Sequence, residues 1–209
     1  QNTAVTLHRG VRGPHRNSGT TFAADVRGSD CVHPSQRART GRTLASHDDD
    51  TVEKANLMAD VGAVIAEFPV TMEAAEVAKA RGLMIAMGAP NAMRGQSYSG
   101  NLSARAAHSA GLLHILAADY HPAAILPAIR ALASEDPDGL VGAVRLASQN
   151  PAKALGLTDR GEIALGKRAD LAIVDSSDRV VQTFRAGEVI FSNGSGPQMT
   201  AQAAISAVA

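Results

Sequence analysis

Short apolar runs that each end in a polar cluster recur through the middle of the chain, and this pattern constrains the fold most. The runs span residues 44–50, 64–69, 83–91 and 112–120, and stretches of helical composition separate them. Strand, polar tip and helix in repetition are typical of a (β/α) barrel or a doubly wound α/β sheet. In both architectures the chemistry lies at the carboxyl ends of the strands, so we expect functional residues in the polar tips.

Helices are predicted between and after these runs, at residues 51–62, 71–81, 122–133, 138–148 and 150–157. Asp50 or Thr51 is expected to cap the first helix, with Asp50 preferred, and Gly62 is expected to end it. Residues 88–101 are dense in Gly, Ser and Asn, which predicts a long loop.

The two ends of the chain differ from this region. Residues 1–42 hold seven Arg and no Lys without a lasting hydrophobic period, which predicts a poorly structured leader, with a basic phosphate-binding arm as the alternative. Residues 151–192 read as a short helix followed by strands and turns, a small β unit. Residues 193–209 are small and polar and are expected to fray.

Composition narrows the classes of function. An apolar fraction of 45% suffices for a core, but no apolar run approaches the roughly 20 residues of a membrane-spanning helix. The formal net charge is zero, which gives no reason to expect nucleic acid or a membrane surface as a partner. A single cysteine, Cys31, fits a reducing cytoplasm.

The richest polar cluster follows the first apolar run, from Ser46 through His47, Asp48 and Asp49 to Asp50. An imidazole beside carboxylates at a strand end suits a divalent metal, since one carboxylate can orient the ring. The alternative is an ordinary helix N-terminus, where acidic residues cap and complement the helix dipole.

Two further acids close apolar strands. Asp119 ends the fourth run, and a carboxylate buried there would need a metal or a proton to compensate its charge. Glu67 ends the second run and can bind metal or substrate, or form a salt bridge at the rim. His114 lies five residues before Asp119, so we expect it on the opposite face of the strand, in a structural role.

The predicted loop 88–101 surrounds a single arginine, Arg94. A guanidinium together with exposed loop N–H groups can hold phosphate oxygens, so Arg94, Asn91, Ser97 and Asn101 are candidate substrate-binding residues. A plain surface loop is the alternative.

Five ordered segments resemble a known family, at residues 44–51, 67–75, 87–95, 99–105 and 118–122. In that order they are similar to the phosphonate-metabolism M protein family, the α-D-ribose 1-methylphosphonate 5-triphosphate diphosphatases of the carbon–phosphorus lyase pathway. Residues 150–171 resemble the closing segment of the wider amidohydrolase superfamily. The resemblance covers about residues 43–192.

The resemblance implies an α/β fold, the second half of an amidohydrolase-type TIM barrel over residues 43–150, with a composite β unit over residues 151–192. It implies a cytoplasmic hydrolase that uses a divalent metal, Zn or Mn, to release pyrophosphate from a phosphorylated small-molecule substrate. By motif, His47, Glu67 and Asp119 would be metal ligands. Asp119 and Asp48 would be catalytic, and Asp49 and Asn91 would lie in or next to the metal and substrate contacts.

The sequence departs from the family pattern in three places. It has no early His-x-His pair, Tyr98 stands where a histidine is expected, and Ala118 stands where a serine is expected. Because residues 1–42 do not resemble the family, we expect a truncated or frame-shifted chain with impaired activity, a lost metal, and an inner sheet face left exposed. The alternatives are an inactive remnant, a half-barrel subunit completed by a homo-oligomer or another chain, and a cyclic amide hydrolase.

Overall fold

The computed structural model describes residues 43–97 and 100–194, and these residues fall into two compact units. We call the described part up to Glu162 the α/β unit and the described part from Ile163 onward the β unit. The predictions for residues 1–42, for Tyr98 and for residues 195–209 lie outside the described residues.

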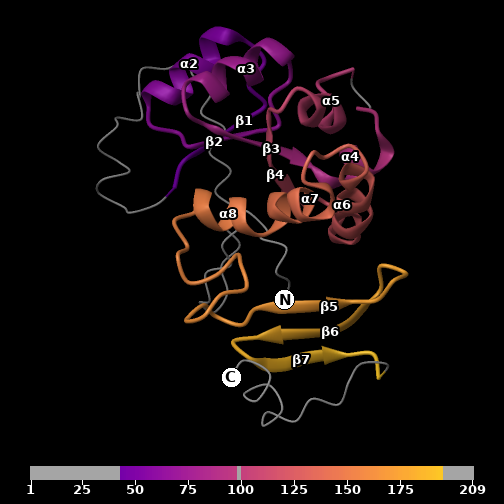
Figure 1. The fold of residues 1–209 in the computed structure, drawn as a ribbon. Helices are drawn as coiled ribbons and strands as arrows, with labels where there is room; N and C mark the ends of the chain where they lie inside the picture. Colours follow the sequence, from indigo (N-terminus) through magenta and orange to yellow (C-terminus); the bar gives the residue numbers. More distant parts are fainter. Residues whose placement is uncertain (1–42, 98–99, 195–209) are drawn as a thin grey trace, which may run out of the picture. The chain divides into compact units, whose positions relative to one another are not determined.

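A parallel sheet forms the centre of the α/β unit (Figure 1). Its strands are β1 (Ala45–His47), β2 (Ile65–Glu67), β3 (Met84–Gly88) and β4 (Leu113–Ala117), hydrogen-bonded in that order. All neighbouring pairs are parallel, so the four carboxyl ends lie along one edge of the sheet. The α/β prediction and the four predicted strands are confirmed.

The first two predicted helices are confirmed as α2 (Val52–Asp60) and α3 (Met72–Ala80), which pack side by side (Figure 1). The cap of α2 is Thr51, whose side chain accepts a hydrogen bond from the Lys54 N–H. Asp50, the preferred candidate, is therefore not the cap, because Thr51 has the extended backbone that aims its hydroxyl at that amide.

The predicted loop 88–101 was partly wrong, because it contains a helix, α4 (Ala89–Arg94). Pro90 lies in the first turn of α4, where its missing N–H costs no hydrogen bond, and Gly95 ends the helix with a φ of 80°. A second short helix, α5 (Ala104–Ser109), begins where the Ser103 side chain accepts from the Ala106 N–H.

The rest of the α/β unit is helical. It comprises a 3₁₀ turn, η1 (Pro122–Ala124), followed by α6 (Ile125–Ala133), α7 (Gly139–Ala147) and α8 (Gln149–Ala154). The Asn150 side chain donates a 2.8 Å hydrogen bond to the carbonyl of His114, which fastens α8 to β4. No helix in residues 43–97 and 100–194 has both the length and the apolar character needed to cross a membrane.

Apolar side chains are buried on both faces of the sheet. Ile85 and Leu116 belong to the larger core cluster beneath the helices, while Ile65, Ala86 and Ile115 form a second cluster with Ala154 and Leu155 packed against it. Residues of this second cluster are at most 1% exposed. The expected exposed inner face was therefore wrong at these positions, since the end of α8 contributes to covering them.

His114 occupies an irregularity between β3 and β4, where the strand register shifts at Ile85 and Ala86. The Ile85 N–H donates a 3.1 Å hydrogen bond to Nδ1 of His114 in place of a backbone carbonyl. Burial, and secondarily the charge of Lys79, lower the pKa of His114, while a backbone hydrogen bond at Leu112 opposes them. The geometry agrees with the predicted structural role.

The β unit is a three-stranded antiparallel sheet of β5 (Leu171–Val174), β6 (Val180–Arg185) and β7 (Glu188–Ser192). Ala186 and Gly187 link β6 to β7 with φ angles of 52° and 83°, as a two-residue hairpin requires. Before β6, the backbone N–H of Arg179, and less strongly that of Ser177, lower the pKa of Asp175 by hydrogen bonding to its carboxylate. The predicted strand and turn pattern is confirmed.

Candidate functional site

Strained backbone marks three of the four strand ends of the α/β unit. Asp48 follows β1 with a φ of 52°, Phe68 follows β2 with 55°, and Asp119 comes two residues after β4 with 53°. Positive φ is unusual for any side chain and most costly for a bulky one, at about 1–3 kcal/mol for each residue. All three residues line the same cavity, which makes that cavity the candidate site.

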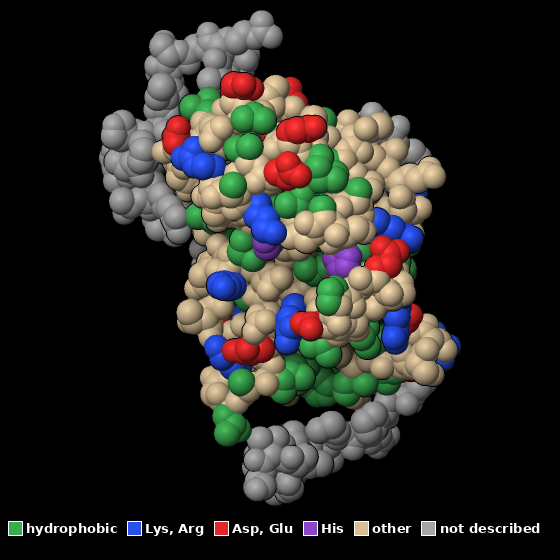
Figure 2. Space-filling view, turned by 45° about the horizontal axis from the view of Figure 1, so that its top comes forward, with side chains coloured by type: hydrophobic (Ala, Val, Ile, Leu, Met, Phe, Trp, Pro, Cys, Tyr) green, Lys and Arg blue, Asp and Glu red, His purple; other side chains and the backbone are tan. Residues whose placement is uncertain are grey.

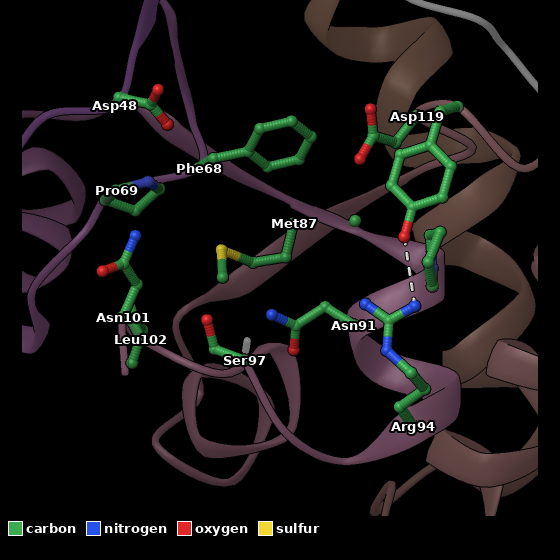
Figure 3. Close-up of a pocket in the computed structure, with 13 residues that line it drawn as sticks. Asp48, Phe68, Pro69, Met87, Asn91, Arg94, Ser97, Asn101, Leu102 and Asp119 are labelled. Atoms are coloured by element: carbon green, nitrogen blue, oxygen red, sulfur yellow. Dashed lines mark hydrogen bonds between the residues drawn. The ribbon is translucent and has the colours of Figure 1, made fainter. Parts of the chain in front are cut away.

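The cavity has a volume of about 250 Å³ and lies at the carboxyl ends of the parallel strands. It brings together six residues predicted from the sequence, namely Asp48, Asn91, Arg94, Ser97, Asn101 and Asp119. Figure 3 shows their side chains around one hollow, with Phe68 between the two aspartates in this view. The structure therefore places two of the strand-end acids, Asp48 and Asp119, and the candidates of the 88–101 segment around one cavity.

Helix α4 and its contacts hold the substrate-binding candidates in place. Asn91 and Arg94 are three residues apart on α4 and so lie on one side of the helix. The Asn91 side-chain oxygen accepts a 2.9 Å hydrogen bond from the Ala104 N–H, which joins α4 to the start of α5. Arg105 donates to the carbonyl of Ala92 at 2.9 Å, where a cation also complements the helix dipole.

Arg94 makes a side-chain contact that the sequence did not suggest. Its Nη1 donates a 3.1 Å hydrogen bond to Oη of Tyr120, drawn as a dashed line in Figure 3. Tyr120 is 69% exposed and also lines the cavity. The available signal was its position directly after Asp119, at the end of an apolar strand.

The structure changes the argument for Asp119. The sequence suggested a buried carboxylate that would need compensation, but Asp119 is exposed at the cavity. Its positive φ carries the chain out of the sheet after β4, so the side chain does not enter the core. Asp119 is therefore a candidate because it lines the cavity, and not because it is buried.

His47 and Glu67 lie beside the cavity and do not line it. Nδ1 of His47 is 3.1 Å from Oδ2 of Asp48, and Nε2 of His47 is 3.9 Å from Oε2 of Glu67. The imidazole also contacts Phe68 edge to face, with ring centroids 5.4 Å apart. Through Asp48 and Phe68 the ring adjoins the candidate site, with half of its side chain exposed.

The predicted metal ligands do not come together as one group. Across residues 43–97 and 100–194, no three His, Cys, Asp or Glu side chains are placed to hold a metal ion. His47 and Glu67 form a pair at the ends of β1 and β2. Asp119 follows β4, and because β3 lies between β2 and β4, these two strands are ~10 Å apart. Zinc sites use three or four protein ligands, so the described residues do not make a metal centre by themselves.

A buried network supports the loop that carries Asp48. Asp49 is 1% exposed and accepts a 2.5 Å hydrogen bond from the Ser46 hydroxyl. Nζ of Lys54 lies 3.7 Å from Oδ1 of Asp49. The same ammonium donates to the carbonyl of His47 at 3.1 Å and to that of Asp48 at 2.7 Å. Asp49 therefore holds the strand tip and does not line the cavity. The role of Lys54 was not predicted from the sequence.

Charge at the cavity is mixed. Among its described lining residues, Arg94 is the cation and Asp48 and Asp119 are the anions. Figure 2 shows acidic and basic side chains interspersed over one face of the molecule. Among the lining residues, attraction of an anion to this site must therefore come from Arg94 and the neutral donors around it.

Comparison with known proteins identifies two levels of similarity in the sequence. The family model described as Amidohydrolase family matches residues 28–190, so the expectation that residues 1–42 do not resemble the family was wrong for residues 28–42. The chain is 44% identical over 153 residues to the α-D-ribose 1-methylphosphonate 5-triphosphate diphosphatase of Escherichia coli (strain K12). The match covers 71% of this chain and 40% of that protein, so the chain spans less than half the length of this relative.

Solved structures share the fold. An N-acetyl-D-glucosamine-6-phosphate deacetylase from Mycobacterium smegmatis superposes with a TM-score of 0.57 at 22% identity, covering 76% of this chain and 50% of that one. A beta-aspartyl dipeptidase from Fervidobacterium islandicum gives 0.57 at 18% identity, covering 78% and 51%. At such identities the likeness concerns the fold alone, and it extends over about half of each of these proteins.

Proposed function

The chain belongs to the Amidohydrolase family, and we propose on that premise that its cavity is the phosphate-binding and carboxylate side of a hydrolase active site. The family resemblance inferred from the five sequence segments is confirmed by the family match and by the 44% identical relative. The substrate and the roles of the individual residues are part of the proposal.

The proposed reaction is hydrolysis of α-D-ribose 1-methylphosphonate 5-triphosphate to the 5-phosphate and pyrophosphate, in phosphonate catabolism. The substrate comes from the name of the relative that is 44% identical over 153 residues. The observation that carries the proposal is the assembly of Arg94, Asn91, Ser97 and Asn101 opposite two strand-end carboxylates in one cavity. A site for a neutral cyclic amide would have no use for a guanidinium, so phosphate is the better fit.

The polar groups on and after α4 would bind the triphosphate. Arg94 presents N–H groups in a fork that matches two phosphoryl oxygens. Asn91, Ser97 and Asn101 add neutral side-chain donors around the same hollow. Such preplaced donors stabilise the charge that develops on phosphoryl oxygens in the transition state.

The carboxylates would act on water. Water attacks phosphorus, a new P–O bond forms, the anhydride bond breaks, and pyrophosphate leaves with the bridging oxygen. Asp119, or Asp48 across the cavity, accepts the proton that the water loses. A carboxylate repels the phosphate chain, so these residues suit water orientation better than substrate binding.

The predicted divalent metal, Zn or Mn, stays a prediction. No group of three metal-binding side chains occurs among the residues that the structure describes, so the proposed steps use side chains of the chain alone. The same observation favours a second candidate function, a chain that binds the phosphorylated substrate without hydrolysing it.

Pyrophosphate release from α-D-ribose 1-methylphosphonate 5-triphosphate, measured with and without Mn²⁺ and Zn²⁺, tests the proposal. We expect Arg94→Ala and Asp119→Asn each to lower the rate by about 10²–10³-fold, as loss of a transition-state donor or base does. Arg81→Ala is the matched control, because Arg81 binds Asp60 and Asn56 on the helices. Tight binding of the triphosphate without pyrophosphate release in any metal would favour the binding-only candidate.

A further inference from the structure

We propose that Tyr120 is a specificity-determining residue of this site, whose phenol hydroxyl and the Arg94 guanidinium together clamp one phosphoryl group of a polyphosphate chain. The inference rests on the proposed function and names a substrate contact that neither the sequence motifs nor the comparisons assign. It is carried by the geometry around the end of β4.

The hydrogen bond between the two side chains fixes the direction of both donors. Nη1 of Arg94 donates to Oη of Tyr120 at 3.1 Å, so the phenol oxygen acts as the acceptor. A tyrosine hydroxyl that accepts one bond still carries its own O–H to donate elsewhere, and a guanidinium has five N–H groups. Since both residues line the cavity, an oxyanion placed there can receive a bond from each.

Backbone strain explains why Tyr120 reaches the cavity at all. Consecutive residues of an extended strand point to opposite faces, so Asp119 and Tyr120 would separate if β4 continued straight. Instead Asp119 has a φ of 53°, and the His121 N–H donates a 3.1 Å hydrogen bond to the carbonyl of Ala118. This tight turn puts both neighbours on the lining of one cavity.

Core packing does not account for the position of Tyr120. The side chain is 69% exposed, although aromatic residues make up only 3% of the chain and would serve the core well. In Figure 3, Asp48 and Arg94 stand on opposite sides of the hollow. A phosphoryl group is therefore expected at the Arg94 side, with the charge of Asp48 across the hollow. Asp119 lies on the same side as Arg94 in this view, so the guanidinium and the phenol must outweigh the repulsion from its carboxylate.

The tyrosine content of the chain allows a direct binding test. The sequence has two tyrosines, Tyr98 and Tyr120, and no tryptophan. In a Tyr98→Phe variant, Tyr120 is the only strong fluorophore. We expect titration with inorganic tripolyphosphate to change its emission, with the same dissociation constant that calorimetry gives for the unmodified chain.

The matched variants are Tyr120→Phe, which keeps the ring and removes the hydroxyl, and Arg94→Lys, which keeps the charge and removes the fork. Because a hydrogen bond to a charged group is lost, Tyr120→Phe should weaken tripolyphosphate binding by about tenfold or more. With α-D-ribose 1-methylphosphonate 5-triphosphate it should raise KM and leave kcat nearly unchanged. The double variant should lose less affinity than the product of the single losses, because the two donors act together.

The outcomes separate the inference from the proposed function. If the unmodified chain binds tripolyphosphate and Tyr120→Phe binds it equally well, the clamp is wrong while the anion site stands. A fall in kcat at constant KM would also overturn the clamp. If the unmodified chain binds no tripolyphosphate, the anion site and the clamp fail together. An unchanged melting temperature of Tyr120→Phe, expected for an exposed side chain, confirms that the fold is intact.

Discussion

The side-chain ammonium of Lys54 donates a 2.7 Å hydrogen bond to the main-chain carbonyl of Asp48. Lys54 lies in α2, and Asp48 has the strained φ of 52° at the tip of β1. The first helix therefore holds the strand tip whose carboxylate lines the cavity. This contact links the stability of the fold to the shape of the candidate site.

Lys54→Met tests that link. The substitution keeps the apolar stem and removes the donors to two carbonyls, as well as the cation nearest buried Asp49. We expect a loss of about 1–2 kcal/mol in the free energy of unfolding and weaker tripolyphosphate binding, because Asp48 is no longer fixed. Urea unfolding and calorimetry measure the two effects.

Lys79→Met is the matched control for Lys54. The Lys79 ammonium also donates to a carbonyl, that of Gly111, at 2.8 Å, and neither residue lines the cavity. The control should lower stability and leave tripolyphosphate binding unchanged. Equal effects of both variants on binding would show that Lys54 has no special role at the site.

Asp119→Gly should separate stability from activity. Glycine adopts a φ of 53° without strain, and the Asp119 side chain is exposed, so we expect a gain of about 1 kcal/mol in stability. Pyrophosphate release should fall with the loss of the carboxylate. Ala186→Gly, at a φ of 52° in the turn between β6 and β7, should stabilise the protein without affecting release, because glycine keeps the backbone N–H that donates to Asp170. A destabilised Asp119→Gly would contradict the strain argument.

The pH dependence of stability should depend on His114. Burial lowers its pKa below the ordinary value of 6.5, so the unfolded chain binds the proton more readily than the folded chain. The contribution to stability is full above pH 6.5 and is lost as the pH falls through the lowered pKa. His114→Asn retains an acceptor for the Ile85 N–H and cannot titrate. As the pH is lowered from 8 to 5, the urea midpoint should therefore fall less steeply in this variant than in the unmodified chain. Equal dependence of the midpoint on pH in the two proteins would exclude His114 as the cause.

Gly142→Ala should destabilise the protein, although helices intrinsically prefer alanine to glycine. Alanine inside a helix is favoured over glycine by about 1 kcal/mol. At Gly142 in α7, however, the added methyl would overlap the Asp136 carboxylate, which also lies 2.9 Å from Nε2 of buried His108. Thermal unfolding of Gly142→Ala, alone and combined with Asp136→Ala, measures the clash. A higher melting temperature for Gly142→Ala alone would show that the carboxylate moves aside at no cost.

Local patterns were sufficient for most of the secondary structure. Gly62 has a φ of 88° after the helix that it was expected to end. Thr71 accepts the hydrogen bond of an N-cap at the start of α3, and Gly82 has a φ of 85° after that helix. The hairpin at Ala186 and Gly187 also follows from local chemistry. Helix α4 escaped detection because it is six residues long and lies in a segment whose composition is that of a loop.

The site could be predicted in part. Asp48, Arg94 and Asp119, which share the cavity, were predicted because strand tips and a lone arginine are visible in the order of residues. Tyr120 and Lys54 were not predicted. The residues around Tyr120 do not indicate that its partner is Arg94, 26 positions away. The residues around Lys54 do not indicate that its ammonium donates to backbone carbonyls.

The sequence by itself determined which residues stand at the carboxyl ends of the strands, because strand and helix periods, caps and turns are properties of neighbouring residues. Only the tertiary structure decided which of those ends open onto a common cavity. The direction of Tyr120 depends on the positive φ of Asp119, and its hydrogen bond joins residues 26 positions apart. Long-range packing stabilises that strained turn and that pairing, whereas local preference disfavours a positive φ outside glycine.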